Sequence, residues 1–223
     1  MSYREFYRRH LPHWQPVNSV LFVTFRLAGS LPLKVIEDLR HQHQQAQKAL
    51  EKIADPTARH SQANLDSRRT FGKWDEALDK CERGARWLAE PEIAEIVAQA
   101  LQDRDRKVFD LFAYCIMPNH VHLVCQIVSP QDDRNDNPAS GKDEYPIMLH
   151  KIMKSLKGYT AYQANLILGR KGTFWQEENY DHVARDAKEL DRIIQYVINN
   201  PVKAGLVKNW EEWPWTYCKI WRD

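Results

Sequence analysis

The stretch from Arg106 to Val128, RKVFDLFAYCIMPNHVHLVCQIV, decides the fold. It contains two runs of β-branched and aromatic residues, 106–116 and 120–128, a composition that is typical of strands. Only Met117-Pro-Asn119 separates the runs, and a short link that contains Pro and Asn favours a hairpin. We therefore expect an antiparallel pair of strands in the middle of the chain.

Further strands and helices flank this hairpin. Residues 19–27, SVLFVTFRL, predict a strand, and residues 174–184 predict an irregular one. A helix is expected over about 146–168, and another begins at Asp186, with Glu189 at capping-box spacing. This order of elements predicts an α+β fold in which helices pack on one face of an antiparallel sheet.

Two segments differ in composition from the rest of the chain. Residues from about 31 to 105 are polar and largely helical in pattern, which indicates a helical insertion after the first strand. Residues from about 129 to 145 hold five acidic and two basic side chains without apolar periodicity, which is typical of a mobile loop. Both segments are acidic on balance, so the remainder of the single domain expected over 1–223 is basic, although the whole chain has a net charge of only +2.

Composition excludes several classes of protein. No apolar run approaches the roughly 20 residues that a membrane-spanning helix requires, and the N-terminal segment lacks the apolar stretch of a signal peptide. The four cysteines are far apart and form no CxxC pair, which disfavours a disulfide scaffold and a zinc ribbon. These features predict a cytoplasmic protein.

A histidine pair follows the turn of the hairpin. Alternate residues of a strand point to the same face, so His120 and His122 are expected to project side by side. Two neutral imidazoles placed in this way can bind one divalent cation and leave positions open for a substrate. A turn-capping histidine beside a surface histidine gives the same pattern, and two ligands alone do not make a metal site. A histidine-triad hydrolase is disfavoured, because the next alternate position is Val124.

The helix that begins at Asp186 carries a tyrosine away from its apolar side. Tyr196 lies outside the apolar stripe, and Asn200 follows one turn later on nearly the same side. A tyrosine in this position is commonly just a boundary residue of the helix. A phenol is also a nucleophile when a cation activates its target, and an asparagine one turn away supplies an oxygen ligand to that cation.

Four segments taken together resemble one family. They are HWQPVNSVLFVTFRLAGSLP at 13–32, MPNHVHLV at 117–124, GTFWQ at 172–176 and YVINNPVKAGLV at 196–207. In their order and spacing the chain resembles the REP-associated tyrosine transposases. This family is a branch of the single-tyrosine HUH insertion-sequence transposases, which are named for a histidine, a hydrophobic residue and a second histidine.

The resemblance implies a ferredoxin-like α+β fold and metal-dependent cleavage and rejoining of single-stranded DNA at REP-like palindromic hairpins. His120 and His122 match the metal ligands, and Tyr196 matches the nucleophile that forms a 5′-phosphotyrosine. Asn200 falls where related transposases carry a glutamine that completes the metal site. The implied cofactor is Mg²⁺ or Mn²⁺, and the implied working form is a monomer or a homodimer.

Basic residues near these motifs are candidate DNA contacts. Lys151, Lys154 and Lys157 lie on one side of the helix over 146–168, and Arg185 follows the predicted irregular strand. A solvated helix face and a structural ion pair explain the same residues without DNA. Two other functions also fit the sequence: a domesticated hairpin-binding protein that has lost cleavage, and a metal-dependent phosphoesterase that forms no protein–DNA adduct.

Overall fold

The computed structural model describes residues 6–8, 12–14, 19–80, 84–128 and 145–219. The chain divides into two compact units. Unit 1 comprises residues 1–27 and 87–223, and unit 2 comprises residues 28–86. The acidic loop expected over about 129–145 lies outside the described residues, apart from its last position.

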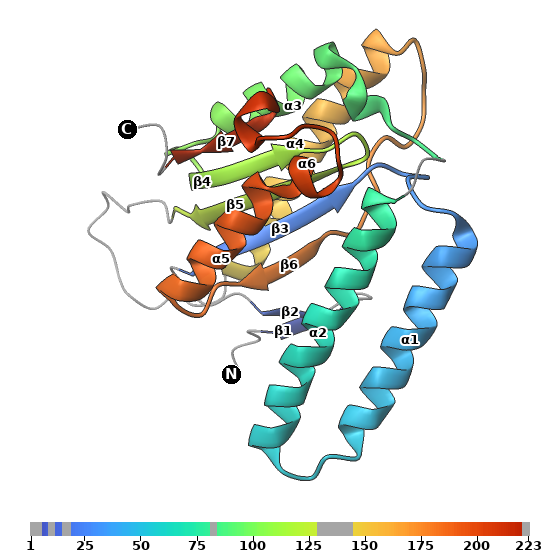
Figure 1. Cartoon of the computed structure of the whole chain (residues 1–223), viewed down its shortest axis with the longest axis vertical. Helices are drawn as coiled ribbons and strands as arrows, with labels where there is room; N and C mark the ends of the chain where they lie inside the picture. Colours follow the sequence, from blue (N-terminus) through green and yellow to red (C-terminus); the bar gives the residue numbers. More distant parts are fainter. Residues whose placement is uncertain (1–5, 9–11, 15–18, 81–83, 129–144, 220–223) are drawn as a thin grey trace. The chain divides into compact units, whose positions relative to one another are not determined.

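Unit 1 is built on an antiparallel sheet of five strands (Figure 1). The strands are β3 (Val20–Arg26), β4 (Phe109–Ile116), β5 (His120–Ile127), β6 (Tyr180–Val183) and β7 (Thr216–Cys218). Their order across the sheet is β6-β3-β5-β4-β7. A separate short pair is formed by β1 (Phe6–Arg8) and β2 (Pro12–Trp14).

The hairpin predicted from the sequence forms the inner part of this sheet. β4 and β5 pair antiparallel, and Met117 closes the turn between them by donating its N–H to the carbonyl of His120. β4 begins three residues later than expected, because Arg106 adopts a left-handed conformation with φ 59° and donates its N–H to the carbonyl of Phe109. This tight turn keeps residues 106–108 out of the strand.

The connections give unit 1 the expected α+β architecture. α3 (Pro91–Gln102) precedes β4 and α4 (Tyr145–Ile167) precedes β6, while β6, β3, β5 and β4 lie side by side. Two strand–helix–strand connections around a central hairpin, with this strand order, constitute a ferredoxin-like arrangement. β7 extends the sheet beyond β4. The prediction of an antiparallel α+β fold is therefore confirmed.

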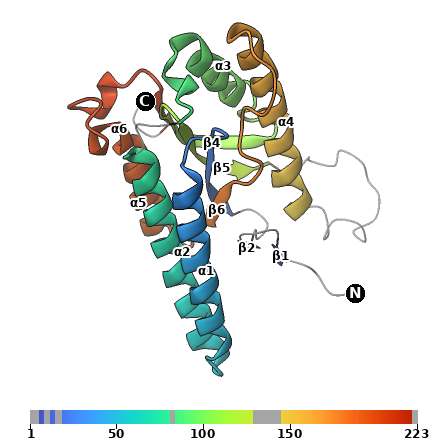
Figure 2. The ribbon, with the colours of Figure 1, turned by 90° about the vertical axis from the view of Figure 1, so that its right-hand side faces the viewer.

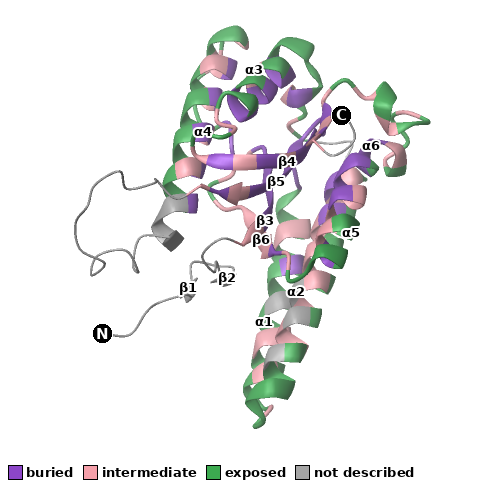
Figure 3. Ribbon diagram, turned by 90° about the vertical axis from the view of Figure 1, so that its left-hand side faces the viewer, coloured by how far each residue is buried: buried purple, intermediate pink, exposed green. Residues whose placement is uncertain are grey.

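The helices cover both faces of the sheet, whereas we expected them on one. α3 and α4 lie on one side, and α5 (Ala187–Ile198) lies on the other (Figure 2, Figure 3). The burial pattern agrees, because both alternating sets of side chains in β3 and β5 are buried almost throughout. The prediction that all helices pack on one face was wrong. The apolar side of α5 is buried against the face of the sheet that α3 and α4 leave uncovered.

α5 begins and ends as its sequence predicts. The side chain of Asp186 accepts a hydrogen bond of 2.7 Å from the backbone N–H of Glu189, which satisfies one of the free donors of the first turn. The helix ends at Ile198, and a short helix, α6 (Asn200–Lys203), continues with Pro201 at its start. A proline disfavours α geometry in the residue before it, so the regular helix stops there. Two 3₁₀ turns, Trp87–Ala89 and Trp210–Glu212, complete unit 1.

Unit 2 is a pair of helices that lie side by side (Figure 1). α1 spans Leu33–Glu51 and α2 spans Pro56–Asp79. Asp55 begins α2 by accepting a hydrogen bond of 2.8 Å from the N–H of Ala58. α3, which falls within the helical block expected over about 31–105, belongs to unit 1 because its apolar side packs in the core there. None of the described helices is long and apolar enough to cross a membrane.

Candidate active site

The register of the sheet places both histidines on the face that α5 covers. Thr24 of β3 pairs directly with His122 of β5, and Arg26 pairs with His120. Directly opposed residues share a face of an antiparallel sheet. Phe22 belongs to this face as well, because its ring packs against those of His122 and Tyr196, with centroid distances of 5.5 and 6.1 Å.

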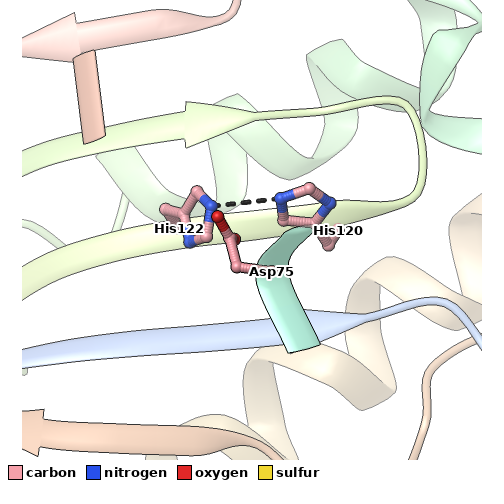
Figure 4. A group of neighbouring side chains, drawn as sticks. All are labelled: Asp75, His120 and His122. Carbon is pink, nitrogen blue, oxygen red and sulfur yellow. Dashed lines mark hydrogen bonds between the residues drawn. The ribbon is translucent and has the colours of Figure 1, made fainter. Parts of the chain in front are cut away.

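The two imidazoles face each other through their Nε2 atoms, which lie 3.0 Å apart (Figure 4). Their rings are nearly perpendicular, with an interplanar angle of 75°. Figure 4 also labels Asp75, which is not part of unit 1: it is a residue of α2 and belongs to unit 2. The expectation that His120 and His122 project side by side from one strand is therefore met in the geometry of unit 1.

The second ring nitrogen of each histidine, Nδ1, lies within hydrogen-bonding distance of a neighbouring side chain. Nδ1 of His120 lies 2.6 Å from Oδ1 of Asn119, and Nδ1 of His122 lies 2.8 Å from Oγ1 of Thr24. With the carboxamide oxygen of Asn119 as the acceptor, the proton of His120 is on Nδ1 and a lone pair is presented at Nε2. The Thr24 hydroxyl can accept from His122 in the same way. Such contacts fix the tautomer and the ring orientation that a metal ligand requires.

This arrangement suits a positive charge between the rings. If both Nδ1 atoms carry protons, two lone pairs point at each other across 3.0 Å. A metal ion between the two Nε2 atoms would relieve that repulsion. The geometry of His120 and His122 therefore fits the donor set of a cation site, with both rings fixed by Asn119 and Thr24.

Tyr196 of α5 lies against the histidine pair. Its ring is 5.7 Å from that of His122, centroid to centroid, at an interplanar angle of 64°. Phe22 packs edge-on against Tyr196, and Nζ of Lys203 lies 5.4 Å from the centroid of the Tyr196 ring. A phenol, two imidazoles and an exposed ammonium thus come together from β5, α5 and α6.

Asn200 is a buried polar residue whose side-chain oxygen and nitrogen make no hydrogen bond to any described residue. A buried polar group without a partner costs free energy and calls for an explanation, such as a bound ion. Its position one turn after Tyr196 is consistent with a metal ligand, and that role stays a prediction.

The start of α5 carries a network of charged groups. The Glu189 carboxylate accepts hydrogen bonds from the Arg185 guanidinium at 2.9 Å and from the Arg185 backbone N–H at 3.0 Å. Nε2 of His182 lies 3.1 Å from the same carboxylate. Burial alone would raise the pKa of Glu189, but the bonds from Arg185 and His182 outweigh it and hold the pKa well below its ordinary value. Arg185 therefore has a structural partner, whereas its role as a DNA contact stays a prediction.

The three lysines predicted as DNA contacts lie on α4, across the sheet from the histidines. Lys151 and Lys154 are exposed, whereas Lys157 is only partly exposed. Nζ of Lys157 donates to the carbonyls of Gln176 and Glu177, both at 3.1 Å. Burial and the nearby charge of Arg26 lower the pKa of Lys157 to about 8. Lys157 is therefore anchored, whereas Lys151 and Lys154 remain exposed to solvent.

Comparison with known proteins finds two relatives that are named as REP-associated tyrosine transposases. A Haemophilus influenzae protein, named provisionally as a REP-associated tyrosine transposase, is 30% identical over 115 residues, which cover 52% of this chain and 61% of that protein. The REP-associated tyrosine transposase of Escherichia coli is 26% identical over 113 residues, covering 51% of this chain and 56% of that protein. The resemblance to the REP-associated tyrosine transposases is confirmed.

These matches cover about half of this chain and less than two thirds of each relative. A solved structure of a REP-associated tyrosine transposase bound to a REP hairpin aligns with a TM-score of 0.46 and 17% identity, covering 94% of this chain and 80% of that one. No protein-family model matches the chain.

Sequence reasoning missed the residues that support the histidine pair and Tyr196. Thr24 and Asn119 orient the histidines, and Phe22 packs against the tyrosine. Asn119 adjoins His120, so it could have been found as a neighbour on the turn. Thr24 and Phe22 could not, because no sequence signal states which residues of β3 stand opposite β5.

Proposed function

We propose that this chain is a metal-dependent transposase-type endonuclease and strand transferase. It cleaves and rejoins single-stranded DNA at REP-like palindromic hairpins through a 5′-phosphotyrosine intermediate. One observation carries the proposal: the Tyr196 ring packs 5.7 Å from His122, whose Nε2 lies 3.0 Å from that of His120. A nucleophile beside a pair of metal-binding nitrogens is the arrangement that such chemistry requires.

His120 and His122 would hold a divalent cation through their Nε2 atoms, and Asn200 would add an oxygen. Mg²⁺ or Mn²⁺ is the ion that the family resemblance implies, and the oxygen of Asn200 together with positions open to phosphate oxygens would supply the oxygen ligands that these ions prefer. When bound, the ion polarises a phosphate oxygen and stabilises the departing 3′-oxygen. The support for Asn200 is that both its polar side-chain atoms are buried without a hydrogen-bond partner among the described residues.

Tyr196 supplies the nucleophile for the proposed reaction. Its phenol loses a proton to solvent, and Oη attacks the phosphorus, so that the bond from phosphorus to the 3′-oxygen breaks. The departing 3′-oxygen takes up a proton, and the 5′ phosphate remains on the tyrosine. Because the phosphodiester energy is kept in the covalent link, a new 3′-hydroxyl can reverse the step and join a different strand without ATP.

REP-like DNA is the proposed substrate because the relatives are named for REP, and its hairpin form is what the family resemblance implies. The proteins of Haemophilus influenzae and Escherichia coli both carry REP in their names. The exposed ammonium groups of Lys151 and Lys154 and the guanidinium of Arg185 are available to contact phosphates. Lys157 would act mainly as a structural residue, since its ammonium group is held by two backbone carbonyls.

One experiment separates the three candidate functions. The chain is incubated with Mn²⁺ and a labelled single-stranded oligonucleotide that contains a REP-like hairpin, and the products are separated under denaturing conditions. A strand transferase gives a labelled protein–DNA adduct, and a second oligonucleotide with a free 3′-hydroxyl then accepts the strand. Cleavage without an adduct identifies a phosphoesterase, and binding without cleavage identifies a hairpin-binding protein. Either of these two results contradicts the proposal.

A further inference from the structure

A buried carboxylate attaches α5 to the edge strand β6. Glu189 lies in the first turn of the helix and is 5% exposed. Its carboxylate accepts two hydrogen bonds from the guanidinium of Arg185, at 2.9 and 3.3 Å, and lies 3.1 Å from Nε2 of His182. His182 belongs to β6, so this contact joins the helix to the sheet. Charge-assisted bonds of this two-pronged kind fix geometry as well as adding stability.

The attachment lies on the same side of α5 as Tyr196. Glu189 and Tyr196 are seven positions apart, and an α-helix falls only about 20° short of two full turns over seven residues. The two side chains therefore project in nearly the same direction, about 10 Å apart along the helix axis. Any rotation of α5 about its axis moves both side chains together.

The two residues also contact neighbouring positions of the sheet. His182 stands directly opposite Phe22 of β3, and directly opposed residues share a face of an antiparallel sheet. Phe22 packs edge-on against Tyr196, with ring centroids 6.1 Å apart, and the Tyr196 ring lies 5.7 Å from that of His122. Glu189 and Tyr196 are thus held against one face of the sheet on adjoining strands.

The apolar side of α5 fixes the rotation of the helix less sharply than the carboxylate does. Ile194, Val197 and Ile198 are buried, but hydrophobic contact is non-directional, so it tolerates small rotations. The hydrogen bonds of Glu189 depend on direction as well as on distance. The carboxylate is therefore the contact that defines which way the side of α5 with Tyr196 points.

We infer that Glu189 is a positioning residue for Tyr196: through Arg185 and His182 it fixes the rotation of α5, and so the approach of the phenol to the histidine pair. It acts through the helix and not on the reacting atoms. A displacement of about 1 Å can cost on the order of 100-fold in rate, so a contact two turns from the phenol can control the reaction. The inference rests on the proposed function for the reaction of Tyr196, but not for its geometry.

Nuclear magnetic resonance of the full chain without DNA tests the geometry alone. The measured quantity is the chemical shift of the His122 imidazole protons, and Tyr196→Leu defines the part of that shift that the phenol ring causes. Glu189→Gln keeps the size of the side chain but removes its charge, and we expect it to reduce this part of the shift. His182→Leu, which cuts the link to β6 but leaves Arg185 on the carboxylate, should act in the same direction.

The rate of adduct formation in a single turnover, at saturating Mn²⁺ and hairpin oligonucleotide, tests the consequence. Glu189→Gln should slow the reaction about 10-fold to 100-fold, while Mn²⁺ affinity and the oligonucleotide concentration at half-maximal rate stay unchanged. Two control variants should keep both the rate and the His122 signal. Thr160→Val controls for lost stability, and Asp191→Asn, at an exposed position of α5, controls for a lost negative charge.

The outcomes separate this inference from the proposed function. An unchanged His122 signal in both Glu189→Gln and His182→Leu would overturn the inference, whether or not the wild-type chain forms an adduct. A wild-type rate in Glu189→Gln, or an equal loss of rate in Thr160→Val, would overturn it as well. The expected change in the His122 signal, together with no adduct from the wild-type chain, contradicts the proposed function alone.

Discussion

The two faces of the sheet in unit 1 use similar residue types in different ways. On the α5 face, His120, His122 and Tyr196 are packed against one another, and Thr24 and Asn119 fix the histidines. On the α4 face, Lys151, Lys154, Tyr159 and Tyr162 are exposed to solvent, and among the lysines of α4 only Lys157 is anchored, by two backbone carbonyls. The difference indicates that one face is built for fixed geometry and the other for adaptable contact. Fixed geometry is what bond-breaking chemistry needs, whereas adaptable contact suits a flexible single strand.

The largest expected effect is the loss of metal binding in His122→Ala. Removal of one of the two nitrogen donors leaves His120 with only the oxygen of Asn200 among the proposed ligands, so the affinity for Mn²⁺ should fall by roughly 100-fold or more. Calorimetry or Mn²⁺ electron paramagnetic resonance measures this directly. His150→Ala on the α4 face should bind Mn²⁺ like the wild type. Equal affinity in His122→Ala and the wild type would show that the α5 face holds no metal at this pair.

A smaller loss of metal affinity is expected when the hydroxyl group that contacts Nδ1 of His122 is removed. Thr24→Val keeps the shape of the side chain but removes the hydroxyl 2.8 Å from Nδ1 of His122. Metal affinity should fall by about 10-fold to 100-fold, as is typical when a partner of a ligand is lost. Thr160→Val is the matched control, because it removes a buried hydroxyl on the α4 face.

The control variant Thr160→Val is itself expected to be less stable than the wild type. Nε1 of Trp175 donates to Oγ1 of Thr160 at 2.8 Å, so Thr160→Val leaves a buried donor without its acceptor. The free energy of unfolding should fall by about 1–3 kcal/mol in denaturant titrations, while Mn²⁺ affinity stays unchanged. If both threonine variants lost metal affinity equally, the two faces would not be independent.

A pH-dependent effect is expected at Glu189, where α5 begins. Its pKa in the folded chain is below its ordinary value of 4.5, so the carboxylate stabilises the fold above about pH 4.5 and this contribution is lost as the pH falls further. Glu189→Gln should therefore lower the unfolding free energy at pH 7 by about 1–3 kcal/mol, with the difference from the wild type shrinking below pH 4. A difference that stayed constant down to pH 3 would show that the charge of Glu189 has no part in anchoring α5.

The smallest effect is expected at Lys203. Its ammonium lies 5.4 Å from the centroid of the Tyr196 ring and is exposed, so solvent weakens its influence. Lys203→Met should slow adduct formation by about twofold to fivefold, which corresponds to the ~0.5–1 kcal/mol of an exposed cation–π contact. Lys208→Met, at another exposed position, should leave the rate unchanged. A loss of 100-fold or more in Lys203→Met would assign this lysine a direct part in the reaction.

The sequence predicted the elements well but not their contacts. The strands at 19–27 and 120–128, the helix at 146–168 and the capped helix that begins at Asp186 all agree closely with the structure. These predictions succeed because hydrophobic period and capping residues are local signals. The position of α5 on the second face was not predicted, since it depends on which sheet surface remains uncovered.

The same distinction applies to the candidate site. Spacing alone brings His120 and His122 together, because they belong to one strand. The approach of Tyr196 to His122 depends on a helix more than 60 residues later in the sequence, so only the family resemblance pointed to it. Thr24 stands opposite His122 through strand register, which a single sequence does not specify.

The central claim is that Tyr196 forms the covalent bond to DNA. Tyr180 is the matched control, because its ring packs against the same Phe22, with a centroid distance of 6.2 Å compared with 6.1 Å for Tyr196. The measurement is the yield of protein–DNA adduct, with Mn²⁺ and a hairpin oligonucleotide, for the wild type, Tyr196→Phe and Tyr180→Phe. We predict no adduct with Tyr196→Phe and a normal yield with Tyr180→Phe. An adduct that persists in Tyr196→Phe would contradict the account.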